Sequence, residues 1–181
     1  MSFENLAVTN KQGVLIVELS RPQALNAFTI EMGRELVQLF ESASEDDDVG
    51  AIILTGNGKA FCAGMDLSAQ GNVFGLDESL NPSMADLDSH YDEPAYVDGV
   101  RDSGGRVTLS MYDCKKPIIV ALNGAAVGIG ASMTLAADIR LASTKARIGF
   151  VFGKIGVTPE ACSTWFLPRI VGMSTALEWV Y

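Results

Sequence analysis

Residues 116–140, KPIIVALNGAAVGIGASMTLAADIR, are the stretch that decides the fold. The apolar run from Ile118 to Leu122, which Asn123-Gly124 follows, predicts a buried β-strand. The chain then passes through Gly128-Ile129-Gly130 into residues 132–137, where we expect a helix. A strand that turns through glycines into a helix leaves backbone N–H groups free where the helix dipole favours negative charge. The stretch therefore predicts an anion site, and we favour a reaction oxyanion over a bound phosphate.

A second glycine-containing loop, KAFCAGMDL at residues 59–67, follows another apolar run at residues 51–54. Each of the two loops could present one backbone N–H to the same small anion. Such a pair of donors suits an enolate-forming or acyl-transfer enzyme, at roughly 3 kcal/mol per donor. The alternative is that both glycine sequences are merely tight turns, and these loops alone do not decide between the two.

Two other kinds of glycine-rich site are excluded by the sequence. Gly124, Gly128 and Gly130 do not form G-x-G-x-x-G, and no acidic residue follows at a suitable strand end, which excludes a dinucleotide fingerprint. No Gly-Lys-Ser/Thr sequence occurs, which excludes a P-loop.

The composition is that of one globular domain over residues 1–181, because 48% of the residues are hydrophobic and 19% are charged. The net charge of −9 argues against nucleic acid and against anionic membrane surfaces as partners. Residues 117–137 are uncharged and long enough to span a bilayer, but their glycines break them into strand, turn and helix. We therefore expect no membrane span.

Cysteine usage indicates a reducing compartment. Cys62, Cys114 and Cys162 are an odd, scattered set without metal-ligand spacing, so we predict no metal site. The start of the chain, Met1-Ser-Phe-Glu-Asn, does not resemble a secretory signal. These features favour a cytoplasmic protein.

Strand-like runs alternate with helical patterns along the chain, which indicates an α/β fold. We expect strands or extended runs at 14–19, 51–54, 118–122, 139–142 and 145–151. We expect one helix that begins after Thr29 as its N-cap, a second over 107–111, and a third that begins at Gly172. We expect a further helix to begin at Val157-Thr158-Pro159-Glu160, with Thr158 as its N-cap and Pro159 at the first helical position. Residues 68–105 are rich in glycine, proline and acids, and we expect a mobile, lid-like surface segment there.

Four stretches carry a family resemblance that covers nearly the whole chain outside residues 68–105. They are RPQALNAFTIEMGREL (21–36), ILTGNGKAFCAGMDL (53–67), KPIIVALNGAAVGIGASMTLAADIRLAS (116–143) and FLPRIVGMSTALEW (166–179). Together they closely resemble the crotonase superfamily, the enoyl-CoA hydratases, isomerases and their relatives. The resemblance implies a crotonase-like spiral of ββα units and a coenzyme A thioester as substrate, with no further cofactor.

The same resemblance implies an oxyanion hole made of two backbone N–H groups. By motif position these belong to Met65, after Ala63-Gly64, and to Ile129, between Gly128 and Gly130. Family hydratases also carry two glutamates that position water, and here Ser132 and Phe152 stand at those positions. A two-glutamate hydratase mechanism therefore does not carry over to this sequence.

Glu160 is the carboxylate that remains. Its segment, Thr158-Pro159-Glu160, looks similar to the segment of peroxisomal-type isomerases in which one glutamate is the sole base. The dehalogenase branch has its nucleophilic aspartate at this place but also needs a histidine at the end of the lid, and His90 lies too far from the match to carry over. Without the resemblance, Glu160 is an ordinary first-turn helix residue.

A single carboxylate suits an isomerase, because one base can remove a proton beside the thioester carbonyl and return it two carbons away. Apolar neighbours such as Phe152, Val157 and Trp165 would raise the pKa of Glu160. We predict an isomerase that shifts a double bond from the 3- to the 2-position. The alternatives are a hydratase or other crotonase reaction, and a non-catalytic acyl-CoA-binding or truncated module.

The resemblance also implies contacts with coenzyme A, which would be made by the main chain around Leu25-Asn26-Ala27 and in the loop at residues 59–67. They point to Ala24, Ala63, Met65, Asp66 and Leu67. Arg21 either meets a phosphate or caps the end of a strand. Relatives continue with a helical region that covers the site and builds trimers, and this sequence ends before it. We expect a homotrimer or hexamer if that region were present.

Overall fold

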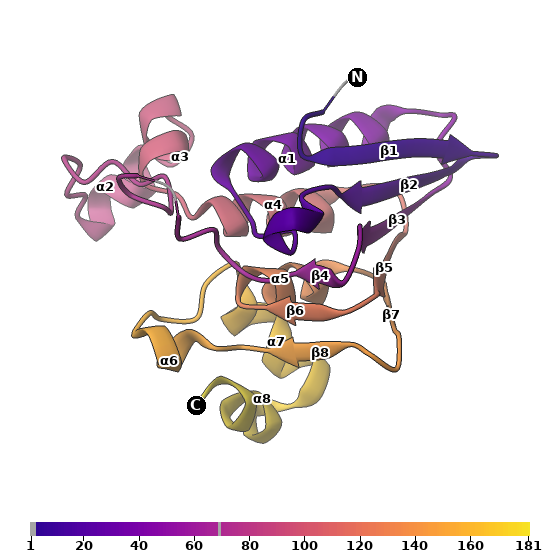
Figure 1. Cartoon of the computed structure of the whole chain (residues 1–181). Coiled ribbons are helices and arrows are strands. Elements are labelled where there is room, and N and C mark those ends of the chain that lie inside the picture. The colour runs from indigo at the N-terminus through magenta and orange to yellow at the C-terminus, as the bar shows by residue number, and fades with distance from the viewer. Residues whose placement is uncertain (1–2, 69) are drawn as a thin grey trace.

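The computed structural model describes residues 3–68 and 70–181, which form two β-sheets with helices packed around them (Figure 1). The larger sheet has the order β1 (Leu6–Lys11), β2 (Val14–Leu19), β3 (Ala51–Gly56), β5 (Ile118–Leu122) and β7 (Ile139–Ala142). β1 is antiparallel to β2, and the other neighbours are parallel. The smaller sheet is parallel, in the order β4 (Ala60–Cys62), β6 (Ala125–Val127) and β8 (Arg147–Gly149).

From β3 onward, consecutive strands belong to different sheets. β3, β5 and β7 lie in the larger sheet, whereas β4, β6 and β8, the next strands along the chain, lie in the smaller one. Helices follow each of these strand pairs, so the chain repeats a ββα unit. The α/β class and the repeated ββα units therefore agree with the expectation from the sequence.

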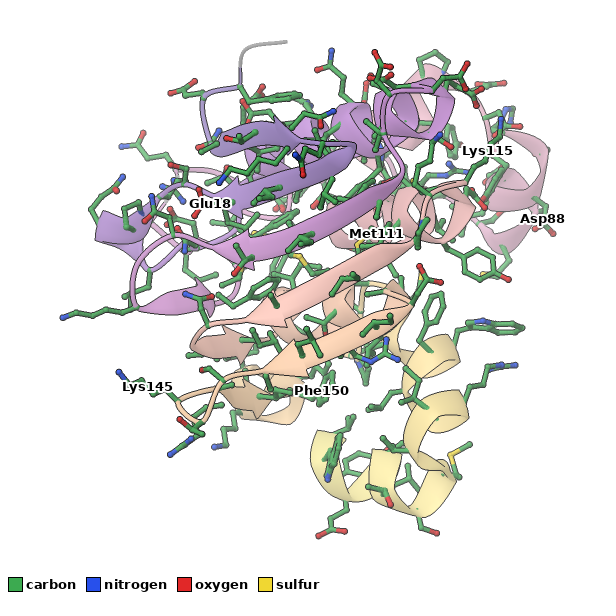
Figure 2. The ribbon with its side chains drawn as sticks, turned by 90° about the vertical axis from the view of Figure 1, so that its right-hand side faces the viewer. Glu18, Asp88, Met111, Lys115, Lys145 and Phe150 are labelled. Carbon is green, nitrogen blue, oxygen red and sulfur yellow. The ribbon has the colours of Figure 1, made fainter. Side chains whose placement is uncertain are left out.

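The first long helix, α1 (Ile30–Glu45), begins where the sequence predicts. The Thr29 hydroxyl accepts a hydrogen bond from the Met32 N–H (3.1 Å), which caps the helix. Met32, Leu36 and Phe40 recur at helical spacing and are fully buried. α4 (Ser103–Asp113) packs beside α1, and its Met111 side chain lies in the same core (Figure 2).

Asn26 fixes the turn that leads from β2 into α1. It follows the short 3₁₀ helix η1 (Pro22–Ala24) and adopts a left-handed conformation (φ 54°). Its buried amide accepts from the Arg21 N–H (2.9 Å) and donates to the carbonyls of Asn57 and Ala60 (both 2.9 Å). One side chain thus ties η1 to the connection between β3 and β4.

Part of the expected irregular segment at 68–105 is helical. It contains α2 (Met84–Ser89) and α3 (Pro94–Gly99), which project from the body of the molecule (Figure 1), and α4 already begins at Ser103. Ser83 and Asp86 form a capping box at the start of α2. Helix α2 was not predicted because this capping signal was not recognised in the sequence.

The predicted helix start at Val157 is wrong. Residues 157–160 are not helical; a short helix, α6 (Phe152–Ile155), precedes them, and α7 (Ser163–Val171) follows. Ala161 (φ 52°) and Cys162 (φ 57°) are left-handed, and a right-handed helix cannot pass through such residues. A tertiary contact of Ala161, described below, therefore overrides the helix-start signal. α7 contains Pro168 in its interior.

The remaining differences are at short elements. The helix expected at 132–137 is α5 (Ile129–Ser132) followed by the 3₁₀ helix η2 (Met133–Ala136), whereas α8 (Met173–Val180) lies where expected. The three-residue strands β4 and β6 were missed because they have too few residues to show periodicity. β1, LAVTNK, was missed because four of its six residues are exposed and it has no apolar run. Within residues 3–68 and 70–181, every helix is too short or too polar to cross a membrane.

Replacing Asn26 tests the turn before α1. Asn26→Ala should lower the free energy of unfolding by roughly 2–4 kcal/mol, because the Asn57 and Ala60 carbonyls and the Arg21 N–H each lose a hydrogen bond and a left-handed residue loses its amide. Urea denaturation measures the change. Asn57→Ala, at an exposed position nearby, should stay within about 0.5 kcal/mol of the wild type. Equal stabilities of the two variants would contradict this role of Asn26.

Candidate active site

The loop after β4 holds the first predicted donor, the N–H of Met65. Phe28 lies beside Met65 in a short parallel bridge, in which the Phe28 N–H donates to Gly64 O (2.7 Å) and the Asp66 N–H donates to Phe28 O (2.8 Å). These bonds fix the main chain on both sides of Met65. Within residues 3–68 and 70–181, no group accepts a hydrogen bond from the Met65 N–H.

The second predicted donor, the N–H of Ile129, is at the first position of α5. Gly128 precedes it at φ 52° and ψ −122°, a conformation that is open mainly to glycine. The carbonyl of Gly128 accepts from the N–H groups of Ala131 and Ser132 (both 2.9 Å). As the first helical residue, Ile129 has no intrahelical acceptor, and the described part of the chain provides no other.

The two donor loops lie at the same edge of the smaller sheet. β4 and β6 are parallel neighbours, so the loops that follow them leave the sheet on the same side. A Cβ atom added to Gly64 would lie 3.3 Å from Val127 O, and one added to Gly130 would overlap Cys62 O. The loops therefore pack directly against each other, and Gly130 is required for this close approach.

Glu160 lines a cavity of about 230 Å³, and neither Met65 nor Ile129 is among its described lining residues. The walls of the cavity come from the lid-like segment, from the start of α4 and from the segment before α7. They consist of Phe74, Leu76, Val100, Asp102, Val157, Thr158 and Glu160. A Cβ atom added to Gly104 in α4 would meet both Ile129 and Ala161, so the residue after Glu160 lies close to the second donor loop.

The pKa of Glu160 is raised from its usual value of 4.5 to about 7. Burial is the largest cause, and the negative charge of Asp102 and a side-chain hydrogen bond with Asp102 add to it. Of the three apolar neighbours named from the sequence, Val157 lines the cavity, whereas Phe152 is buried in a separate cluster and Trp165 is 54% exposed. The contribution of Asp102 to the raised pKa of Glu160 was not predicted from the sequence.

Asp102 connects α4 to the turn after Glu160. As the N-cap of α4, it accepts hydrogen bonds from the N–H groups of Gly104 (2.9 Å) and Gly105 (3.0 Å), and its Oδ2 also accepts from the Ala161 N–H (2.7 Å). An aspartate directly before a helical pattern is an N-cap signal, so its capping role could have been found from the sequence. Its contact with Ala161, 59 residues away, could not.

Ser132 and Phe152, which stand where family hydratases have their two glutamates, provide no carboxylate. Ser132 is fully buried, and its hydroxyl donates to Gly128 O (3.2 Å). Phe152 is 2% exposed and packs with Phe150 in the second apolar cluster. Any carboxylate chemistry in this cavity therefore falls to Glu160 and Asp102.

The segments predicted to hold coenzyme A lie next to each other. The Ala63 N–H donates to Leu25 O (3.1 Å), which joins the turn containing Ala24 to the first donor loop. Leu67, at the end of this loop, is 63% exposed. This adjacency agrees with the expected grouping of Ala24, Ala63, Met65, Asp66 and Leu67, whose contacts with coenzyme A stay a prediction.

Arg21 and Asp66 form an ion pair (Nη2–Oδ2 2.8 Å) in which both side chains are partly buried. A hydrogen bond from the Ser68 hydroxyl, and then one from Arg21, lowers the pKa of Asp66 to about 2. Arg21 also donates to Ala27 O. Its guanidinium thus binds the first donor loop to the turn before α1, instead of only capping a strand.

His90 is at the end of α2, and it is absent from the described residues that line the Glu160 cavity. Its Nδ1 lies 2.7 Å from Glu93 Oε1, and its ring stacks on Tyr96. Glu93 and the nearby Asp86 raise the pKa of His90.

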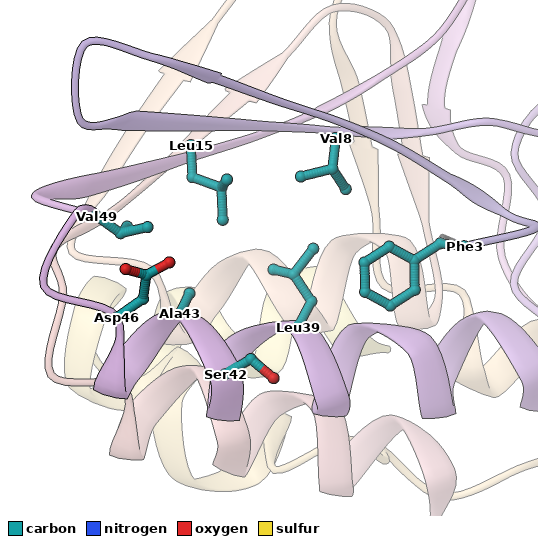
Figure 3. Close-up of a pocket in the computed structure, with 8 residues that line it drawn as sticks. All are labelled: Phe3, Val8, Leu15, Leu39, Ser42, Ala43, Asp46 and Val49. Carbon is teal, nitrogen blue, oxygen red and sulfur yellow. The ribbon is translucent and has the colours of Figure 1, made fainter. Parts of the chain in front are cut away.

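A larger apolar cavity of about 280 Å³ lies away from this site. It is between the β1–β2 hairpin and α1 (Figure 3), and its lining includes Val8, Leu15 and Leu39. Asp46, at its rim, is the one titratable residue in its described lining. Its described lining has no second carboxyl group beside Asp46, unlike that of the Glu160 cavity, which has Asp102 and Glu160.

Glu160→Gln should make the stability of the protein less sensitive to pH. The folded state keeps the Glu160 proton up to about pH 7, whereas the unfolded chain releases it near 4.5, so ionisation of Glu160 destabilises the fold as pH rises between these values. Relative to the wild type, the variant should gain on the order of 2 kcal/mol between about pH 4 and pH 8. Urea unfolding at both pH values measures this gain. Glu178→Gln, at an exposed position, should show none, and a Glu160→Gln gain no larger than this control would contradict the burial of the Glu160 carboxyl.

Comparison with known proteins places this geometry in a family. The enoyl-CoA hydratase/isomerase family model matches residues 14–177. An enoyl-CoA hydratase of Alternaria alternata is 36% identical over 179 residues, which cover 98% of this chain and 54% of that protein. The 1,2-epoxyphenylacetyl-CoA isomerase of Escherichia coli is 33% identical over 167 residues, which cover 92% of this chain and 58% of that protein.

Solved structures agree with the sequence matches. An enoyl-CoA hydratase/isomerase from Pseudoalteromonas atlantica superimposes with a TM-score of 0.75 at 32% identity, over 97% of this chain and 61% of that one. The chain thus spans little more than half the length of the relatives that it matches. The match over residues 14–177, together with the shared fold, shows that this chain belongs to the enoyl-CoA hydratase/isomerase family and has the crotonase fold.

Proposed function

We propose that the protein is an enoyl-CoA isomerase that moves a double bond of an acyl-CoA thioester from the 3- to the 2-position. The observation that supports this most is Glu160 itself, a carboxyl group with a raised pKa in a largely apolar cavity. The next residue, Ala161, lies close to Ile129 of the second donor loop. Asp102 already accepts three backbone hydrogen bonds, which leaves Glu160 as the better placed base.

In the proposed reaction the Glu160 carboxylate takes the proton from C2 of the 3-enoyl thioester. The C–H electron pair forms a C1–C2 double bond, and the carbonyl π electrons move onto the thioester oxygen to give a dienolate. The protonated Glu160 then returns the same proton to C4, the C2–C3 double bond forms and the carbonyl is restored. One base therefore completes the cycle with no net change in protons.

The N–H groups of Met65 and Ile129 would stabilise the dienolate oxygen. Support comes from their positions in two touching loops at one sheet edge and from the lack of a protein acceptor for either N–H within residues 3–68 and 70–181. Fixed donors of this kind contribute roughly 3 kcal/mol each to transition-state stabilisation. Backbone donors also account for the glycines next to them, because the main chain must approach the substrate closely.

The pKa of Glu160 suits a residue that both accepts and returns a proton. At about 7 it lies near neutral pH, where the product of correct protonation state and driving force is largest for general acid–base catalysis. Because the ionised form is the base, turnover should rise with pH up to about 7 and then level off.

Hydration is the second candidate. It is favoured by the name of the Alternaria alternata relative, which is a hydratase. Hydration is disfavoured because Ser132 and Phe152 stand where family hydratases have their two water-positioning glutamates. The Asp102–Glu160 pair would have to position the water instead. A non-catalytic acyl-CoA-binding role is the third candidate.

Glu160→Gln should reduce isomerisation of a 3-enoyl-CoA by roughly 10²–10⁴-fold, because it removes the base and keeps the shape of the side chain. The absorbance of the conjugated product measures turnover, and calorimetry with an acyl-CoA should show that binding is retained. Glu178→Gln, at an exposed position on α8, is the matched control and should turn over like the wild type. Full activity of Glu160→Gln would remove Glu160 from the mechanism.

Incubation of the wild type with a 2-enoyl-CoA separates the remaining candidates. We expect no 3-hydroxyacyl-CoA, since neither family glutamate is present. Accumulation of the hydroxy product would establish hydration instead. Acyl-CoA binding without turnover of either enoyl isomer would establish a binding module.

A further inference from the structure

The Asp102 carboxylate is held by main-chain groups of two different elements. Gly104 and Gly105 N–H, in the first turn of α4, and Ala161 N–H, directly after Glu160, all donate to it. The helix dipole of α4 also favours negative charge at this place. Main-chain groups of the protein itself thus hold Asp102 in place.

The surroundings of the pair are otherwise poor in charge. Among the described residues that line the cavity, Asp102 and Glu160 are the two that titrate, and the rest are apolar apart from Thr158. Cys162 lies on the same turn, and burial together with Asp102 raises the pKa of its thiol. Arg101, next to Asp102, stacks on Tyr91 (3.5 Å) in the lid-like segment.

We propose that Asp102 is the positioning residue for Glu160: it holds the turn after Glu160 through the Ala161 N–H and pairs with the Glu160 carboxyl group so that the two share one proton. For its catalytic consequence, this inference rests on the proposed function of Glu160. The pairing itself is a property of the protein without substrate and can be measured separately.

The shared proton follows from the charges. Two carboxylates in one partly buried site cannot both ionise at low cost, so one retains a proton to a higher pH. The three N–H donors stabilise the charge on Asp102, which leaves the proton on Glu160. When Glu160 takes a proton from substrate, its new O–H donates to Asp102, and this bond breaks again when the proton is returned.

Two variants of Asp102 test the pairing. Asp102→Asn removes the charge with little change in shape, and Asp102→Ser removes it while keeping a good N-cap for α4 in case the asparagine variant fails to fold. Asp113→Asn makes the same charge change at an exposed site at the other end of α4 and serves as the matched control.

The first measurement is a titration of the substrate-free protein labelled with ¹³C at the glutamate carboxyl carbons, in which the Glu160 signal is assigned from its absence in Glu160→Gln. The midpoint of Glu160 should fall by at least about one pH unit, a tenfold loss of proton affinity, in either Asp102 variant. It should not move in Asp113→Asn. A midpoint unchanged in every folded Asp102 variant overturns the pairing.

The second measurement is the pH profile of kcat/KM with a 3-enoyl-CoA. Its acid limb should shift to lower pH by the same amount as the titration midpoint, whereas a merely structural role of Asp102 would lower the whole profile without moving this limb. If Glu160→Gln is fully active, the proposed function fails and the titration still decides the pairing. If Glu160→Gln is inactive but the midpoint does not move, the pairing fails and the proposed function stands.

Discussion

The parallel pairing of β4 with β6 is the constraint on which the candidate site depends. Each strand has only three residues, yet their alignment makes the two donor loops leave the smaller sheet at one edge. Gly130 allows the second loop to lie directly on Cys62, and Gly128 turns the chain so that a helix begins with an unpaired N–H. β4 also contacts β3 of the larger sheet, and α5 packs against both β4 and β6.

Electrostatics around Glu160 depend on a second, smaller arrangement. The start of α4 contributes a carboxylate, and the segment before α7 contributes a glutamate and the amide that binds this carboxylate. These two segments are far apart in the sequence, and Gly104 makes room for Ile129 and Ala161 at the point where they meet. Burial of one acid beside another is what raises the pKa of Glu160.

Much of the fold could be read from the sequence because its longer elements have clear periodicity. Val14–Leu19 and Ile118–Leu122 are apolar runs and became strands, and Thr29 caps α1 as predicted. The family motifs also pointed to both donor loops and to Glu160, whose roles stay predictions. The start of α7 was misplaced because a tertiary hydrogen bond at Ala161 overrides the local Thr158-Pro159 signal. For the same reason the Asp102 contact, which depends on long-range packing, was missed.

The two left-handed residues after Glu160 have a mechanical consequence. Neither Ala161 nor Cys162 is glycine, and each such residue costs of order 1–3 kcal/mol, so the turn stores strain that the Asp102 bond helps to hold. Asp102 lies directly between the projecting α3 helix and α4. Loss of the Asp102–Ala161 bond would therefore remove one of the contacts that hold this strained turn, and Glu160 with it, in place.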